Sequence, residues 1–161
     1  MTAGRAGRAV FVQDRQRAFR VPAPAIRRAA GAALDYAGPL PGGLSIVVVG
    51  HREMRQLNRR FARVSGTTDV LAFDLSGGPA PSHDDIAGEV VVNAELALSQ
   101  AARRRCAPRR ELLLYVVHGV LHLCGYGDST PARKKRMRQA EAAVLRRLAP
   151  RKRIRCSCRS R

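Results

Sequence analysis

The sequence has no long apolar run and no pattern of cysteines that would build a disulfide framework. Its first twelve residues lack the apolar stretch of a signal peptide, and no later segment approaches the length of a membrane span. The four cysteines, Cys106, Cys124, Cys156 and Cys158, lack disulfide-framework spacing, so we expect reduced thiols. These absences predict a cytoplasmic protein without a membrane segment.

Acidic residues are scarce as well. The chain has 12 Asp and Glu against 30 Lys and Arg, a formal net charge of +18 and a pI near 11.6. Such an excess favours a polyanionic partner, because Lys and Arg bind phosphates and release their counterions. RNA, DNA and ribosomes all qualify. Only three of the basic residues are lysines, so a genome rich in arginine codons is an alternative explanation.

The length of 161 residues and the 45% hydrophobic content suit one domain. Hydrophobic periodicity predicts short strands and longer amphipathic helices in alternation. The strands are expected at 9–12, 45–49, 70–73 and 89–92, and the helices at 24–37, about 51–61, 94–103, 111–124 and 131–148. The predicted fold is α+β: a single domain, residues 1–149, with a small mixed sheet of about four strands packed against helices.

Residues 150–161 are expected to form a disordered tail. They include six basic residues, no acid and one large apolar residue, Ile154, so the segment cannot bury itself. The tail either adds non-specific affinity for phosphates or is incidental. One close pair, Cys156 and Cys158, is weak support for a structural zinc site.

The helix predicted at 111–124 is apolar nearly all round, which is typical of a helix buried in the middle of a domain. It carries His118 and His122. Residues four apart project from one helix face with Cβ atoms about 6 Å apart, so both rings can bind one metal ion. The alternative is a pair of core histidines whose nitrogens are satisfied by carbonyl or carboxylate groups.

Asp128 is the predicted third ligand. Gly125 and Gly127 allow a sharp chain reversal that returns Asp128 to the helix end. Two imidazoles and a carboxylate suit zinc and leave one position for a water molecule, which the metal activates as the nucleophile. This metal-bound water is the expected catalytic group, and no side-chain base is assigned. Alternatively, Asp128 is a turn or N-cap residue next to Ser129 and Thr130.

The residue after the first histidine separates two classes of hydrolase. Zinc peptidases with the pattern His-Glu-x-x-His have a glutamate general base there, whereas this chain has Gly119. A peptidase is therefore disfavoured. An RNA substrate fits better, because its phosphate can bind the metal while a basic surface holds the backbone on either side.

Segment 118–126, His-Gly-Val-Leu-His-Leu-Cys-Gly-Tyr, resembles the signature of the YbeY-type endoribonucleases, bacterial rRNA maturation factors in which two histidines and a third ligand six residues on bind zinc. Upstream, 57–58 (Leu-Asn), 68–73 (Thr-Asp-Val-Leu-Ala-Phe) and 88–91 (Gly-Glu-Val-Val) are similar to further family motifs in the same order. The family usually has Asp then His where this chain has Gly127 and Asp128, so the third ligand departs from the pattern.

The resemblance implies one zinc ion per chain, bound by His118, His122 and Asp128. It also implies an endoribonuclease for single-stranded RNA that processes precursor rRNA near the 16S 3′ end, with the small ribosomal subunit as partner and a role in ribosome maturation and quality control. The alternative is a non-catalytic RNA- or ribosome-binding protein with a degenerate site. The oligomeric state is not predicted.

Family members often have an arginine for RNA phosphate at the position of Ala62. Arg59 or Arg63 can substitute for it, although both can equally be solvated surface charges.

Four further polar residues have less support as members of the site. Asp69 and Glu89 are possible partners of the ligand rings, with a turn-stabilising role equally open for Asp69. His51 is expected at a helix start and His83 in an exposed loop, so neither is placed in the site.

Overall fold

Four strands and five α-helices make up the part of the chain that the computed structural model describes, residues 9–77 and 85–149. One short π-helix, η1, directly follows the second α-helix. In chain order the elements are β1 (Val10–Asp14), α1 (Ala23–Ala37), β2 (Gly43–Val49), α2 (His51–Leu57), η1 (Asn58–Ala62), β3 (Val70–Asp74), β4 (Ile86–Asn93), α3 (Ala94–Arg104), α4 (Pro108–Leu123) and α5 (Pro131–Leu148).

The strands form one mixed sheet in the order β1-β2-β4-β3. β1, β2 and β4 run parallel, and β3 pairs antiparallel with β4 at the edge. The two central strands are rich in buried valine, as expected for strands covered on both faces. This arrangement confirms the predicted α+β fold with a four-stranded mixed sheet.

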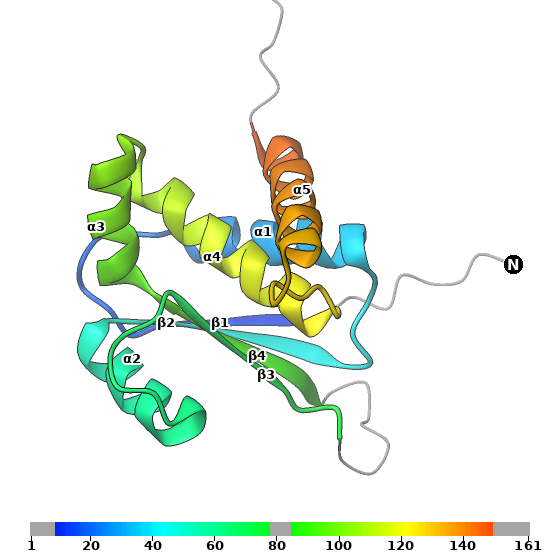
Figure 1. The fold of residues 1–161 in the computed structure, drawn as a ribbon, viewed down its shortest axis with the longest axis horizontal. Coiled ribbons are helices and arrows are strands. Elements are labelled where there is room, and N and C mark those ends of the chain that lie inside the picture. Colours follow the sequence, from blue (N-terminus) through cyan, green and yellow to red (C-terminus); the bar gives the residue numbers. More distant parts are fainter. Residues whose placement is uncertain (1–8, 78–84, 150–161) are drawn as a thin grey trace, which may run out of the picture.

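Helices cover both faces of the sheet, unequally. α1, α4 and α5 lie over one face, and α2 lies over the other (Figure 1). The larger core forms where α4 packs on the sheet, with Leu112, Val116 and Val120 fully buried. A smaller cluster around Met54 fills the α2 side. The prediction of a central buried helix carrying both histidines is confirmed.

α4 reaches the sheet closely because Gly119 has no side chain. A Cβ atom there would lie 2.8 Å from Val70 Cγ2 and still closer to Val90. Either contact is shorter than packed carbon atoms tolerate. The position that holds glutamate in the peptidase motif therefore faces the sheet and has no room for a side chain.

The segment after Gly50 differs from the single helix predicted at about 51–61, in which Met54, Leu57 and Phe61 recur at helical spacing. Met54 is buried, but α2 ends at Leu57 and continues as the π-helix η1. The wider π turn takes Phe61 out of the 3.6-residue register. Phe61 is consequently 55% exposed, and its ring contacts that of Phe73 edge-on at 5.1 Å.

The helix predicted at 111–124 begins earlier, at Pro108, because proline is accepted in the first turn of a helix. Cys106 and Cys124 form no disulfide bond within the described residues. None of the helices described is long and apolar enough to cross a membrane. His83 and the predicted tail at 150–161, with Cys156 and Cys158, lie outside the described residues.

Candidate metal centre

Two imidazole rings one helical turn apart form the base of the site. The Nε2 atoms of His118 and His122 lie 2.9 Å apart, and the rings meet edge-on with their centroids 4.5 Å apart. Both side chains are partly buried. The spacing of four residues on α4 thus brings the two ring nitrogens together, as the sequence predicted.

Asp128 joins the two rings because α4 ends in a Schellman motif. Gly125 has a φ of +88°, and the Tyr126 and Gly125 N–H groups donate to the carbonyl oxygens of Leu121 and His122, each at 3.0 Å. The chain then turns back along the helix. Of the two glycines, only Gly125 has a positive φ, so Gly127 is not needed for the reversal in the way that we expected.

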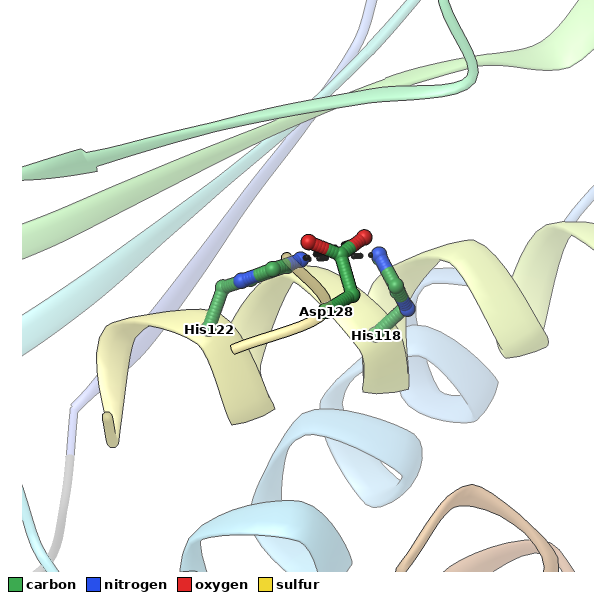
Figure 2. A group of neighbouring side chains, drawn as sticks. All are labelled: His118, His122 and Asp128. Carbon is green, nitrogen blue, oxygen red and sulfur yellow. Dashed lines mark hydrogen bonds and ion pairs between the residues drawn. The ribbon is translucent and has the colours of Figure 1, made fainter. Parts of the chain in front are cut away.

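The three side chains converge, as Figure 2 shows, with the carboxylate of Asp128 near both rings. Asp128 Oδ2 lies 3.8 Å from His122 Nε2, and one donor atom from each residue lies within 4.8 Å of the other two. Asp128 is the most exposed of the three residues. Such a group of donors can hold a metal ion.

Glu141 on α5 is a partner of the site that the sequence did not reveal. Its Oε1 lies 2.6 Å from His118 Nδ1, on the opposite side of the ring from the Nε2 that faces His122. α5 presents Glu141 beside its buried stripe of Met137, Ala140 and Val144. Glu141 is the only acid on this strongly basic helix, and that isolation is the signal that could have identified it.

The two rings have opposite shifts in pKa. Burial lowers the pKa of His118, but the hydrogen bond and charge of Glu141, with the charges of Asp69 and Asp128, outweigh burial and raise it. Burial and the neighbouring His118 lower the pKa of His122. A proton on His118 Nδ1, held by Glu141, leaves Nε2 of that ring to bind a metal ion. This is the usual arrangement of a metal-binding histidine.

An open groove of about 620 Å³ runs between β3 and the histidine end of α4. We refer to it as the metal groove. Its lining includes three carboxylates, from Asp69, Asp74 and Asp128, and no Lys or Arg. The charge of this groove between the helix and the sheet therefore suits a cation.

Asp69 stabilises the turn before β3 and also lines the metal groove. Its Oδ1 accepts hydrogen bonds from the Val70 N–H at 3.0 Å and the Thr68 hydroxyl at 3.1 Å. Glu89 shares one face of β4 with Val91, two residues on, and Val91 packs in the cluster around Met54. Because side chains alternate along a strand, Glu89 faces away from the histidines.

His51 is the first residue of α2, as predicted, and the group of donors at the metal groove does not include it. Its Nδ1 lies 3.0 Å from the side-chain nitrogen of the buried Asn93.

Two buried asparagines hold the loop that leads to Asp69, a role that sequence reasoning missed. The Asn58 amide donates to the Gly66 carbonyl at 3.2 Å, and the Asn93 amide donates to the Thr68 carbonyl at 3.1 Å. Asn93 also caps α3 by accepting from the Leu96 N–H at 3.1 Å. Asn58 of the Leu-Asn pair at 57–58 thus has a structural role. For Asn93, its position between a predicted strand and a predicted helix was the sequence signal that could have identified it as a helix cap.

Arg59 and Arg63 do not line the metal groove. Arg59 is in η1 and Arg63 directly follows it with a left-handed backbone, and both are exposed, as is Ala62. This segment continues from α2 on the sheet face opposite α4 (Figure 1). Any contact between these arginines and RNA is therefore made away from the histidines.

The fold and the three converging donors define a class: an α+β protein with a candidate single-metal centre on a buried helix. Residues 12–149 match the family model described as Endoribonuclease YbeY. The chain belongs to this endoribonuclease family.

Relatives with the same description occur in several bacteria. The chain is 38% identical over 127 residues to Endoribonuclease YbeY of Anaeromyxobacter sp. (strain Fw109-5), covering 79% of this chain and 65% of the relative. It is 38% identical over 121 residues to that of Salinibacter ruber, covering 73% and 77%. The solution structure of TM1509 from Thermotoga maritima shares the fold, with a TM-score of 0.58, 21% identity and coverage of 86% and 88%.

Proposed function

We propose that this protein is a zinc-dependent endoribonuclease that cleaves precursor rRNA near the 16S 3′ end. In this proposal His118, His122 and Asp128 hold one zinc ion per chain, and the enzyme acts with the small ribosomal subunit in the cytoplasm. The main support is the convergence of three donor side chains at the head of an open groove. Membership of the endoribonuclease family supports the RNA substrate.

The donor set fits zinc. Zinc ligands lie about 2.0–2.2 Å from the ion, so two ligands of a tetrahedral site are roughly 3.3 Å apart. The His118 Nε2–His122 Nε2 separation of 2.9 Å and the His122 Nε2–Asp128 Oδ2 separation of 3.8 Å lie on either side of that value, and all three donor atoms lie within 4.8 Å of one another. Three protein ligands leave one coordination position open, which is the pattern of catalytic rather than structural zinc sites.

Each residue of the site has a distinct part in the proposed reaction. Zinc, when bound, supplies a Lewis acid that polarises a phosphodiester oxygen and lowers the pKa of water. Glu141 fixes the ring of His118 through Nδ1, which keeps Nε2 directed into the site. The carboxylates of Asp69 and Asp74 repel phosphate, so RNA enters the metal groove only when the cation is present.

Cations outside the metal groove hold the RNA backbone. The net charge of +18 supports this, although it names no single residue. Arg59 and Arg63 are proposed to contact phosphates across the edge of β3, in place of the family arginine at the position of Ala62. The rRNA substrate and the ribosomal partner are proposed from the family and from this charge.

A cleavage assay tests the proposed function. A structured RNA containing the 16S 3′ end is incubated with the zinc-loaded protein, with and without chelator. We expect cuts that chelator abolishes and added zinc restores. RNA binding without chelator-sensitive cuts would instead support the rival, a non-catalytic RNA-binding protein with a degenerate site.

The third ligand is tested separately with Asp128→Ala and Asp128→His. The alanine variant should lose zinc affinity, whereas the histidine variant, which restores the usual family residue, should keep it. Zinc content after dialysis is the measurement. An alanine variant that keeps the full zinc content would rule out Asp128 as a ligand.

A further inference from the structure

A second groove lies between α4 and α5, on the other side of the histidines from the sheet. Its volume is about 690 Å³, and it runs along the N-terminal half of α4 and the C-terminal half of α5. We call it the α4–α5 groove. Leucines and alanines make up most of its lining, and arginines make up most of the rest: Ala107, Arg109, Arg110, Leu113, Leu114, Arg138, Glu141, Ala142, Leu145, Arg146, Leu148 and Ala149.

The α4–α5 groove leads to the metal centre. Arg110 and Leu114 line it, and they precede His118 and His122 at successive intervals of four residues on α4. Residues at this spacing form one slowly turning stripe, here about 18 Å long. Glu141 lines the groove as well and contacts His118 Nδ1 at 2.6 Å. The groove therefore begins where the metal centre ends.

The rim of the α4–α5 groove is positive. Arg109, Arg110, Arg138 and Arg146 are all exposed, and none of them forms an ion pair with an acid in residues 9–77 or 85–149. Glu141 is the only acid in the lining, and its carboxylate contacts His118 Nδ1 rather than an arginine. Four guanidinium groups around one groove, none paired with an acid of the described residues, attract an anion with several charges.

The floor of the same groove is apolar. Leu113, Leu114, Leu145 and Leu148 are only partly buried there, although they belong to the two helices that cover the core. Leu114 is not packed against the main core cluster, so its side chain is available to a ligand. An apolar floor between basic rims suits a ligand with flat apolar groups on a charged backbone.

We propose that the α4–α5 groove binds the unpaired RNA segment next to the phosphate that reacts at the metal centre. The arginines contact its phosphates and the leucines contact its bases. A duplex presents mainly phosphates and sugars at its surface, so it would leave the leucine floor unused, whereas single-stranded RNA offers base faces to it. The role of the α4–α5 groove in holding a substrate for cleavage rests on the proposed function. Its binding of single-stranded RNA does not.

Fluorescence anisotropy with a labelled, unstructured RNA of twelve uridines tests the binding, in chelator so that no cleavage occurs. The full chain is compared with the double variant Arg110→Gln/Arg138→Gln. A matched control removes two exposed arginines outside the groove, Arg28→Gln/Arg103→Gln. Far-ultraviolet circular dichroism checks that all three proteins are folded. We expect identical spectra, because arginine and glutamine have similar helix propensities.

The rim variant should bind the RNA about tenfold more weakly at 0.1 M salt, and its log–log salt slope should fall by about 1.4, or about 0.7 for each phosphate that is no longer bound. The control should bind like the parent chain. Equal losses in both variants would show non-specific attraction and overturn the proposal. A twelve-base-pair duplex that binds more tightly than the single strand would overturn it as well.

An acidic protein segment is the competing occupant. An amphipathic helical peptide of Leu and Glu serves as its probe, because such a helix can also place leucines on the floor and carboxylates at the rim. If this peptide displaces the RNA and its own binding depends on Arg110 and Arg138, the groove is a protein-docking site and the proposal fails. Weak peptide binding that leaves the RNA in place supports it.

A steady-state assay separates this inference from the proposed function. With zinc-loaded protein and cleavable RNA, the rim variant should raise KM about tenfold and leave kcat unchanged, because its contacts hold the strand and do not touch the reacting phosphate. If the parent chain does not cleave RNA, the proposed function fails, while the anisotropy result still decides whether the groove binds RNA.

Discussion

The two halves of α4 border grooves of opposite charge, although the bordering side chains form one stripe along the helix. At the C-terminal half, His118 and His122 border a groove with three carboxylates and no Lys or Arg. At the N-terminal half, Arg110 and Leu114 border a groove with four arginines and an apolar floor. One half attracts cations and the other attracts anions, although both belong to a single helix.

The difference teaches how a very basic protein can keep a cation site. A local excess of arginine would repel a divalent ion at short range. In this structure carboxylates line the groove at the histidines, and the arginines line the other groove. Metal binding and RNA binding are then separable properties. A change in one half of α4 should therefore leave the binding property of the other half intact.

His118→Ala should have the largest effect. Loss of an imidazole ligand should weaken zinc binding more than about a hundredfold, beyond the range found for residues that only support a ligand. RNA affinity measured in chelator should stay unchanged, since the arginine rim is intact. Metal analysis and anisotropy on the same sample check both expectations, and a parallel fall in RNA affinity would contradict the separation of the two halves.

Glu141→Gln should weaken zinc binding about ten- to a hundredfold, because the amide no longer holds His118 Nδ1 with a charge. Competition with a chromophoric chelator measures the affinity. Gln139→Ala on the exposed side of α5 is the matched control and should leave zinc affinity unchanged. Equal zinc affinities for Glu141→Gln and the parent chain would remove Glu141 from the site.

Gly119→Ala tests the close approach of α4 to the sheet beside the metal groove. The added methyl group would overlap Val90 and Val70, so the free energy of unfolding should fall by about 1–3 kcal/mol. Gly31→Ala is the control: the helix α1 has open space there, and the change should stabilise it by about 0.5–1 kcal/mol. Urea denaturation of the metal-free proteins compares the two, and equal stabilities would show that α4 can move aside freely.

Arg59→Gln/Arg63→Gln should have the smallest effect. These residues lie away from both grooves, so RNA affinity should fall only about threefold at 0.1 M salt, with a smaller change in salt slope than for the rim variant. Anisotropy with an RNA longer than twelve nucleotides is the measurement. A loss as large as that of Arg110→Gln/Arg138→Gln would shift the main RNA contact to the α2 side of the sheet.

Local patterns accounted for much of the fold and for the three donors. The periodicity of residues 111–124 identified the buried helix, and the spacing of His118 and His122 followed from helix geometry alone. The glycine at 125 is the residue that a Schellman motif requires, and this made the return of Asp128 predictable. Each of these signals lies within one continuous segment of the chain, at most about four helical turns long.

Other features escaped prediction because they depend on partners distant in sequence or on competing local geometries. Glu141 meets His118 across 23 residues, and no spacing rule links two different helices. The π-helix at 58–62 replaced the expected helical turn, and Phe61 became exposed as a result. Asn58 and Asn93 are both buried because they satisfy carbonyls of one loop, which the sequence does not pair with either residue.

The sequence by itself determined which residues can donate to a metal and that two of them share one helix face, because helix periodicity is a local property. Only the tertiary structure decided that three carboxylates gather at one end of α4 and four arginines at the other. That segregation arises from the packing of β3 and α5 against opposite sides of the same helix. Charge counted along the chain cannot show it, since electrostatic attraction depends on distance in space.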